Sequence, residues 1–475
     1  MRLRKKKWLI PCAAALFTIG ASMTSFAAQG WVQENNTWVY YDSNGYFATD
    51  AWRKSGDSWF YLDSDGHTAA SRVIESDGSY YYVNSVGAMV TNEWREIPSD
   101  YEDEDSPDTY WYYFGSNGKA YKAPSSGKTS FKSIRVANGD YHNYAFDSEG
   151  RLLSGWVNED SERVTGEEAW KDGIYYCGNS ADGARANNEW RRIDVEDDEN
   201  DEYNFDGTYW FYFGSNGKKI KDANKTINGG KYHFNENGAA EYEWYESDTV
   251  SSTSSASQAK YYNLPTQCWL AKGWFKTVPS EDIDQDAYED DKEYWFYATG
   301  NGKVVTSQIK SINGLRYAFN DKGEMLHGIY KMTFDDNKKL ESYKKIKTED
   351  DFPEADEACQ VYCFGNSPKE GAMATGKTTI DIDGEKYTFN FRKSGSSKGA
   401  GYNGIYDSSI YVQGRMLKAD RDEKYKVVEY NGKEYLVGTS GKLAKNKSNV
   451  KDGDDKYYRT NSDGTIEDSG YEKIK

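Results

Sequence analysis

The sequence predicts an all-β protein, an elongated solenoid of stacked β-hairpin repeats with acidic loop insertions. Aromatic residues make up 16% of the chain, and Tyr alone accounts for 41 of its 475 residues. Aliphatic residues are scarce, so a large aliphatic core is excluded, and disordered chains are poor in aromatic residues. This composition favours many small, local aromatic clusters, and a regular spacing of aromatics and glycines supports the same conclusion.

An aromatic-rich segment recurs along the chain, and in six copies a Gly follows seven residues after the first aromatic. These pairs are Trp38 and Gly45, Trp59 and Gly66, Tyr80 and Gly87, Trp111 and Gly118, Trp210 and Gly217, and Trp295 and Gly302. A variant runs from Tyr144 to Gly150, from Tyr232 to Gly238 and from Tyr317 to Gly323. Alternating aromatic residues favour a half-buried strand.

Tight turns separate the paired strands in several repeats. The turn sequences are Asn228-Gly229, Asn313-Gly314, Asp383-Gly384 and Asn431-Gly432. These residue pairs tolerate the positive φ that a two-residue hairpin turn requires. Each unit of about twenty residues is therefore expected to be a hairpin, which is unstable alone but stable when stacked on its neighbours. We expect essentially no helix after residue 28.

A longer period overlies the short one. The segment from Glu93 to Ile97 matches that from Glu189 to Ile193, and an acidic stretch follows each. We therefore expect cell-wall-binding-type repeats at 28–128, repeat supermodules at 129–246 and 247–330, and degenerate repeats at 331–475. The acidic stretches span 100–108, 194–206, 281–293 and 349–357. They are either solvated loops or Ca²⁺ ligands, and residues 251–257 are expected to form a flexible junction.

The first residues are typical of a secretory signal peptide. A basic segment up to Lys7 precedes an apolar segment from Trp8 to Met23, and small residues around Ala27 provide a cleavage site. We predict cleavage after residue 27, with an uncleaved N-terminal anchor as the alternative. No later stretch is long or apolar enough to span a membrane. The expected product is secreted and lies at the wall or surface of a Gram-positive bacterium.

The net charge bears on the class of partner, and the cysteines bear on disulfides and metal binding. The formal net charge is −18, which disfavours nucleic acid as a partner. The cysteines that remain after cleavage are Cys177, Cys268, Cys359 and Cys363. They form one or two disulfides or stay free. The spacing of Cys359 and Cys363 lacks a second ligand pair for zinc, and no cofactor or metal is expected.

The signatures of common enzymes are absent from the sequence. We find no nucleophile elbow, zinc-protease motif, P-loop or kinase motif. Repeats fill the chain and leave no room for a separate catalytic domain, so a non-catalytic role is expected. A glycosidase pair of carboxylates stays open, because carboxylates are abundant.

The run from Gly30-Trp31 through Trp38 to Gly45, followed by Trp52 and Trp59, resembles the choline-binding or cell-wall-binding repeats of Gram-positive bacteria. The segments 227–235 and 312–320 are similar to the related repeats of glucan-binding regions and clostridial toxin tails. The resemblance implies a hairpin solenoid that holds choline between repeats in cages of aromatic rings.

Transferred to this sequence, the resemblance implies two cages. Trp31, Trp38 and Tyr61 would form one, and Trp52, Trp59 and Tyr82 the next, with Met89 nearby. The pattern departs from the family where Phe47 and Thr68 occupy the usual Met positions, and the rings could instead be core. The implied partner is cell-wall polysaccharide or teichoic acid, with choline possible. The alternative is a surface adhesin or structural protein that binds surface or host proteins.

Overall fold

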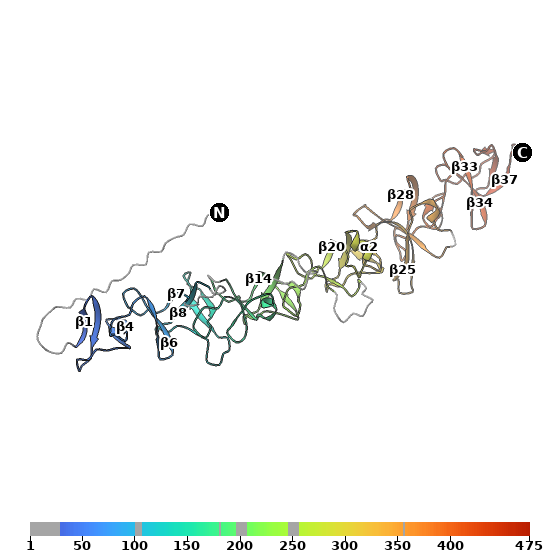
Figure 1. The fold of residues 1–475 in the computed structure, drawn as a ribbon. Coiled ribbons are helices and arrows are strands. Elements are labelled where there is room, and N and C mark those ends of the chain that lie inside the picture. Colours follow the sequence, from blue (N-terminus) through green and yellow to red (C-terminus); the bar gives the residue numbers. More distant parts are fainter. Residues whose placement is uncertain (1–28, 100–106, 180–181, 196–206, 246–255, 355–356) are drawn as a thin grey trace. The chain divides into compact units, whose positions relative to one another are not determined.

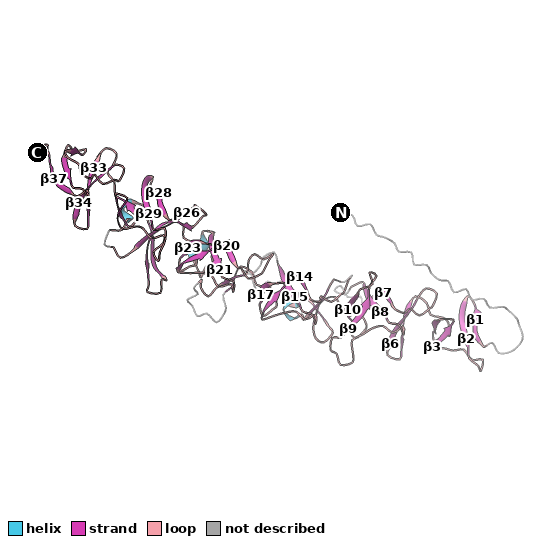
Figure 2. Cartoon of the chain, turned by 180° about the vertical axis from the view of Figure 1, so that it is seen from behind, coloured by secondary structure: helices cyan, strands magenta, loops and turns pink. Residues whose placement is uncertain are grey.

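The computed structural model describes residues 29–99, 107–179, 182–195, 207–245, 256–354 and 357–475. These residues form a succession of antiparallel β-hairpins (Figures 1 and 2), which confirms the predicted all-β class. The predicted signal peptide and the acidic segments 100–106 and 196–206 lie outside the described residues, as does most of the expected junction at 251–257.

The chain divides into two compact units. The first holds Met1–Arg191, Val195–Asp201 and Tyr212–Lys219, and the second holds Arg192–Asp194, Glu202–Phe211 and Ile220–Lys475. In most of the pairs, each strand bonds to the next strand along the sequence, as a chain of hairpins requires.

The strands that begin before residue 192 are short. They are β1 (Gly30–Glu34), β2 (Thr37–Tyr41), β3 (Ala51–Ser55), β4 (Ser58–Leu62), β5 (Arg72–Ser76), β6 (Ser79–Val83), β7 (Glu93–Pro98), β8 (Thr109–Phe114), β9 (Phe131–Arg135), β10 (Tyr141–Ala145), β11 (Gly155–Val157), β12 (Arg163–Val164), β13 (Tyr175–Cys177) and β14 (Glu189–Asp194). The one-turn helix α1 (Ala169–Asp172) precedes β13.

The strands from β15 to β23 are also short. They are β15 (Thr208–Phe213), β16 (Ala223–Ile227), β17 (Gly230–Phe234), β18 (Trp244–Tyr245), β19 (Lys260–Tyr261), β20 (Gly273–Thr277), β21 (Tyr294–Ala298), β22 (Gln308–Ile312) and β23 (Leu315–Phe319). The helix α2 (Gln285–Glu289) lies between β20 and β21. Part of the acidic stretch 281–293, for which we expected a solvated loop or Ca²⁺ ligands, is therefore helical.

The C-terminal part contains larger sheets than simple hairpins. One sheet has the order β25-β24-β26-β27 and another the order β28-β29-β32-β31-β30. The strands are β24 (Gly328–Phe334), β25 (Leu340–Lys345), β26 (Gln360–Gly365), β27 (Ala372–Met373), β28 (Gly376–Ile382), β29 (Glu385–Phe391), β30 (Gly404–Tyr406), β31 (Ser409–Val412), β32 (Arg415–Met416), β33 (Tyr425–Tyr430), β34 (Lys433–Gly438), β35 (Val450–Lys451), β36 (Tyr457–Thr460) and β37 (Ile466–Gly470), with the 3₁₀ turn η2 (Glu349–Asp351).

The structure confirms the predicted turns. The six glycines at the seven-residue spacing all have positive φ, between 73° and 83°. In the turn between β16 and β17, Asn228 has φ 48° and Gly229 has φ 85°, and the other Asn-Gly and Asp-Gly pairs behave alike. Positive φ at both central residues matches the twist of the flanking strands.

A second turn leads out of each hairpin. The Oδ1 atom of Asp63 accepts hydrogen bonds from the backbone N–H groups of Asp65 and His67, at 3.1 and 2.9 Å. The equivalent Asp42, Asn84, Asp147 and Asn235 make the same pair of bonds. A short polar side chain at this position thus closes the connection locally.

Two of the expected domain boundaries fall within paired structure. The boundary after residue 246 lies between the paired strands β18 and β19, and the boundary after residue 330 lies inside β24. The boundary after residue 128 falls in the connection between β8 and β9. The repeat modules themselves stay a prediction.

Candidate functional site

The first four hairpins of the first unit form three interfaces rich in aromatic side chains. The first interface lies between β1–β2 and β3–β4, the second between β3–β4 and β5–β6, and the third between β5–β6 and β7–β8. Side chains alternate between the two faces of a strand, so each hairpin gives one set of rings to the preceding interface and another set to the following one.

In the first interface, Trp31 packs against both of its neighbours. Its ring lies 5.5 Å from that of Tyr40 on the same hairpin and 5.5 Å from that of Phe60 on the next, both edge-on. The Nε1–H group of Trp31 donates to the carbonyl of Lys54 at 3.1 Å. Trp38 is half-buried and faces the same side as Trp31, since it pairs with Gln33.

In the second interface, Trp52 takes the role of Trp31. Its ring lies 5.1 Å from Tyr61 on its own hairpin and 5.0 Å from Tyr81 on the next. Trp59 lies on the same face, because it pairs with Lys54, and 42% of its surface is exposed. The buried Nε1–H group of Trp52 has no hydrogen-bond partner among the described residues.

The structure groups these rings differently from the sequence prediction. Phe60 rather than Tyr61 contacts Trp31, and Tyr81 rather than Tyr82 contacts Trp52. Tyr61 instead lies beside Trp52, and Tyr82 faces Phe114 at 6.1 Å in the third interface. The difference is one residue, and one residue along a strand reverses the face that a side chain occupies.

Met89 borders the second interface through its backbone. Its N–H group donates to the carbonyl of Trp59 at 2.8 Å. Its side chain packs against the turn that follows β8 of the fourth hairpin, where a Cβ atom on Gly118 would collide with the sulfur. Thr68 and Ala120 occupy equivalent positions and donate to the carbonyls of Trp38 and Tyr80. This hydrogen bond from each exit segment to the preceding hairpin fixes the spacing of the interfaces.

Two arginines of the chain lie on rings at these interfaces. The guanidinium carbon of Arg53 lies 5.2 Å from the centroid of the Tyr40 ring in the first interface. That of Arg95 lies 5.5 Å from the centroid of Tyr82 in the third. A cation over an aromatic face is attracted by the quadrupole of the ring. These interfaces therefore already hold positive charge against aromatic rings.

The electrostatics around Tyr61 in the second interface are mixed. Burial and the nearby carboxylate of Asp50 raise the pKa of Tyr61, whereas Arg72 lowers it. Arg72 is itself paired with Asp63 at 3.4 Å. Arg72 therefore brings a positive charge of the chain itself to the second interface, next to the carboxylates of Asp50 and Asp63.

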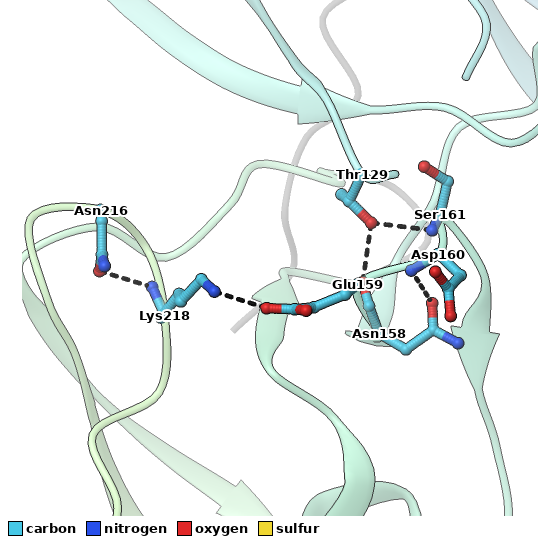
Figure 3. Close-up of polar contacts among 7 residues, drawn as sticks. All are labelled: Thr129, Asn158, Glu159, Asp160, Ser161, Asn216 and Lys218. Atoms are coloured by element: carbon cyan, nitrogen blue, oxygen red, sulfur yellow. Dashed lines mark hydrogen bonds and ion pairs between the residues drawn. The ribbon is translucent and has the colours of Figure 1, made fainter. Parts of the chain in front are cut away.

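A polar loop at residues 158–161 of the same unit provides hydrogen-bonding and charged groups instead of aromatic rings (Figure 3). The Oγ1–H group of Thr129 donates to the carbonyl of Asn158 at 2.8 Å, and its oxygen accepts from the N–H of Ser161 at 2.8 Å. Lys218 Nζ lies 2.5 Å from Glu159 Oε1. This hydrogen bond lowers the pKa of Glu159 and raises the pKa of Lys218. These contacts tie together segments that are distant in sequence and hold the loop in one shape.

A hollow of about 770 Å³ is lined partly by this loop and by Tyr110 and Trp111 of β8. Arg151 lies 4.9 Å from the centroid of the Tyr110 ring and 2.6 Å from Asp147. Ser161 is 4% exposed, and its hydroxyl has no partner among the described residues. Rings beside fixed polar groups are the features with which proteins bind small molecules.

The described residues contain no cluster of three or more His, Cys, Asp and Glu side chains that could hold a metal ion. No helix in the described part of the chain is long and apolar enough to cross a membrane. The four cysteines after residue 28 are free thiols, and burial raises the pKa of Cys177 to about 12.

The hairpins, their turn glycines and the aromatic interfaces define a repeat protein of stacked β-hairpins. The family described as putative cell wall binding repeat matches residues 29–47, 50–67, 108–120 and 225–240. These four segments match a cell wall binding repeat, as the resemblance predicted.

Glucosyltransferase-S of Streptococcus mutans serotype c is 24% identical over 236 residues. The match covers 50% of this chain and 12% of that protein, so the chain spans a small part of its relative. Choline binding protein F from Streptococcus pneumoniae is a similar solved structure, 17% identical with a TM-score of 0.31 over 77% of this chain and 98% of that chain. The choline-binding domain of CbpL from the same species is 23% identical with a TM-score of 0.30 over 46% and 88%.

Proposed function

We propose that this protein is a secreted, non-catalytic protein that attaches non-covalently to the wall of a Gram-positive bacterium through aromatic sites between its hairpins. The supporting observation is the second interface, where Trp52, Trp59 and Tyr61 face the same side of one hairpin. Trp59 keeps 42% of its surface exposed, so a ligand can reach the ring without unfolding the stack.

Rings arranged in this way bind organic cations. Each good contact between a cation and a ring contributes about 0.5–2 kcal/mol, so a single site is weak. Repetition along a chain compensates for weak sites, because a polymer that carries many ligands engages several sites together. A wall polymer that bears quaternary ammonium groups, such as a choline-substituted teichoic acid, has this property.

A saccharide is the second candidate ligand, and the hollow beside Ser161 favours it. Sugars present both apolar C–H faces and hydroxyl groups. Tyr110 offers a ring to the former, while Arg151 and the unpartnered Ser161 hydroxyl offer hydrogen bonds to the latter.

The test is retention of the full chain on purified cell walls. Elution by choline would identify the cation as the ligand, and elution by a wall-derived oligosaccharide alone would identify the sugar. A folded chain that stays in solution with walls would overturn the proposal and favour the adhesin alternative, in which the rings serve only as core.

A variant at Trp59 tests whether retention on cell walls depends on the aromatic rings of the second interface. Trp59→Ala should weaken wall binding by about 2- to 30-fold, the equivalent of one lost contact. Trp269→Ala is a matched control, because Trp269 is also 42% exposed but lies outside these three interfaces. Equal retention of both variants, with the fold intact by circular dichroism, would contradict a role for the second interface.

A further inference from the structure

The helix α2 belongs to a long connection between the paired strands β20 and β21. We call this connection, residues 278–293, the α2 segment. Ile283 of the segment is buried in a small cluster on which the ring of Trp244 packs. The carbonyl of Val278 also accepts a hydrogen bond from the Nε1–H group of Trp244 at 2.8 Å. The α2 segment therefore covers one side of the aromatic cluster around Trp244.

A second attachment joins the α2 segment to the turn that follows β23. The carboxylate of Asp284, at the start of the helix, lies 2.6 Å from Lys322 Nζ. The carboxyl group of Glu324, on the same turn as Lys322, is hydrogen-bonded to the carboxyl group of Asp284. Both acidic side chains are buried. We call Asp284 and Glu324 the carboxyl pair, and it is the contact through which the segment meets the turn.

Burial is unusual at the position of Glu324. It directly follows the turn glycine Gly323, and the residues that follow the equivalent glycines of other hairpins can be compared with it. His67, Lys119 and Lys303 occupy this position after Gly66, Gly118 and Gly302, and all three are exposed. Glu324 differs because Asp284 of the α2 segment lies against it.

The contact within the carboxyl pair requires a proton. Oε1 of Glu324 is buried without a hydrogen-bond donor among the described residues, and Oε2 accepts from Asn320 at 2.8 Å. Carboxylates only accept hydrogen bonds, so one member of the pair must be protonated. Burial, together with the bond to Asp284, raises the pKa of Glu324 to about 7. Hydrogen bonds with Lys322 and Glu324 lower the pKa of Asp284 despite its burial, so Glu324 carries the proton.

The other charged and titratable groups near the carboxyl pair do not replace this proton. Lys322 already pairs with one of its members, and Lys292 of the α2 segment lies 4.9 Å from the centroid of a tyrosine ring. Tyr330 of β24 and Tyr343 of β25 also face Glu324, and burial raises the pKa of each to about 12, so both stay neutral. The hydroxyl of Tyr343 donates to Asp321 at 3.1 Å.

We propose that the α2 segment is a pH-dependent latch, which the shared proton of the carboxyl pair holds closed below neutral pH and which opens locally when that proton is lost. Without the proton, two negative charges would meet in a place that excludes water, and burial of unpaired charge is costly. Opening hydrates both carboxylates and uncovers one side of the Trp244 cluster, while the strands keep their pairing. This inference does not depend on the proposed function.

The test is hydrogen–deuterium exchange of the full chain at pH 5, 6 and 7, corrected for the intrinsic exchange rate at each pH. The amides that report are those of Asp284, Tyr288 and Lys292, which are hydrogen-bonded within the α2 segment. Their protection should fall by up to about tenfold per pH unit, because opening releases one proton in this range. The amides of β21 and β23 should keep their protection.

Two variants separate the carboxyl pair from other effects of pH. Glu324→Gln should keep the segment equally protected at each pH, because a neutral amide can donate to Asp284 and accept from Asn320. Glu281→Gln is the matched control, since Glu281 is an exposed carboxylate of the same segment. It should leave the pH dependence of the wild type unchanged.

Equal protection of the wild-type α2 segment at pH 5 and pH 7 would overturn the latch. A loss of protection that is equally large in β21 and β23 would also overturn it, because the pair would then act on the whole unit. A folded Glu324→Gln chain with the pH dependence of the wild type would do the same. If Glu324→Gln fails to fold, Asp284→Asn decides, since an amide there can donate to an ionised Glu324 and should likewise abolish the dependence.

Discussion

Gly118 illustrates how a single residue sets the spacing between hairpins. Its φ is +76°, a conformation that a residue with a side chain adopts only with strain. A Cβ atom at this position would also collide with the sulfur of Met89 from the preceding exit segment. The turn glycine therefore serves two needs, a left-handed backbone and a close approach between neighbouring hairpins.

We predict that Gly118→Ala destabilises the first unit by about 2–5 kcal/mol, of which about 1–2 is backbone strain and the rest overpacking. Gly127→Ala is the control, since Gly127 has the same φ of +76° but nothing within 4 Å of its Cβ position. It should cost only the strain. Urea denaturation measures both, and equal losses would show that Met89 moves aside freely.

Burial determines how readily the cysteine thiols react. Burial raises the pKa of Cys268 to about 12 and that of Cys363 to about 11. It also raises the pKa of Cys359 to about 11, helped by Glu357. A thiol reacts as its thiolate, so all of these groups should be slow nucleophiles at pH 8.

We therefore expect little reaction of the folded chain with Ellman's reagent at pH 8. In a chain that begins at residue 29, Cys359 should react first, because it is only partly buried. Unfolding in urea should expose the full thiol content. Rapid reaction of a whole equivalent in the folded state would contradict the burial.

At the scale of elements, the helix α2 depends on a pair of carboxyl groups. Asp284 caps the helix by accepting a hydrogen bond from the N–H of Ala287 at 3.3 Å, and it pairs with Lys322 at 2.6 Å. Glu324, 6% exposed, lies against this group and accepts a hydrogen bond from Asn320 at 2.8 Å. Burial, together with a hydrogen bond to the negatively charged Asp284, raises the pKa of Glu324 to about 7.

This shift predicts a pH dependence with a definite sign. Between the ordinary carboxyl pKa and about pH 7, the folded chain keeps a proton on Glu324 that the unfolded chain has lost. The free energy of unfolding should therefore decrease as the pH rises through this window, by roughly 1–3 kcal/mol. Glu324→Gln should remove the dependence, because a neutral amide needs no proton.

The measurement is urea denaturation of both proteins at pH 5 and pH 8, monitored on the transition of the second unit. The variant should lose less stability than the wild type over this range. Parallel pH profiles would show that Glu324 is ionised in the folded state and that the helix cap tolerates two adjacent charges.

At the scale of the whole molecule, the first unit ends at Lys219. Lys219 is 8% exposed, and its Nζ lies 5.0 Å from the centroid of the Trp156 ring and 3.1 Å from the carbonyl of Lys171. Its N–H group donates to the carbonyl of Ile174 at 2.8 Å. This lysine is thus an internal cation that closes the last aromatic cluster of its unit.

We expect a chain spanning 29–222 to be more stable than one spanning 29–217, which lacks Lys219. The loss should be roughly 2–4 kcal/mol, since a charged hydrogen-bonded group and a cation–π contact disappear together. In the longer chain, Lys219→Met should reproduce most of the loss, whereas the exposed Lys221→Met should not. Equal urea midpoints for the two chain lengths would place the end of the unit elsewhere.

Local features of the sequence determined the class of the fold and its turns. The spacing of Trp38 to Gly45, repeated along the chain, and pairs such as Asn228-Gly229 act within a few residues. Their effect on φ and on strand faces does not depend on distant parts of the chain. Most of the hairpins before residue 328 could therefore be predicted. The sheets β12-β11-β13 and β28-β29-β32-β31-β30 could not, since β11 and β29 each also pair with a strand beyond their neighbour in sequence.

Only the tertiary structure decided which rings meet. The family resemblance placed Tyr61 with Trp31, but the face on which a ring lies depends on strand register, and a shift of one residue reverses it. The packing brings Phe60 to Trp31 and Arg53 to Tyr40, contacts between hairpins that no local spacing encodes. The equivalent rings of Tyr40, Tyr82 and Tyr61 meet Arg53, Arg95 and Ile74, respectively. The difference arises from the residue that the neighbouring hairpin places opposite each ring.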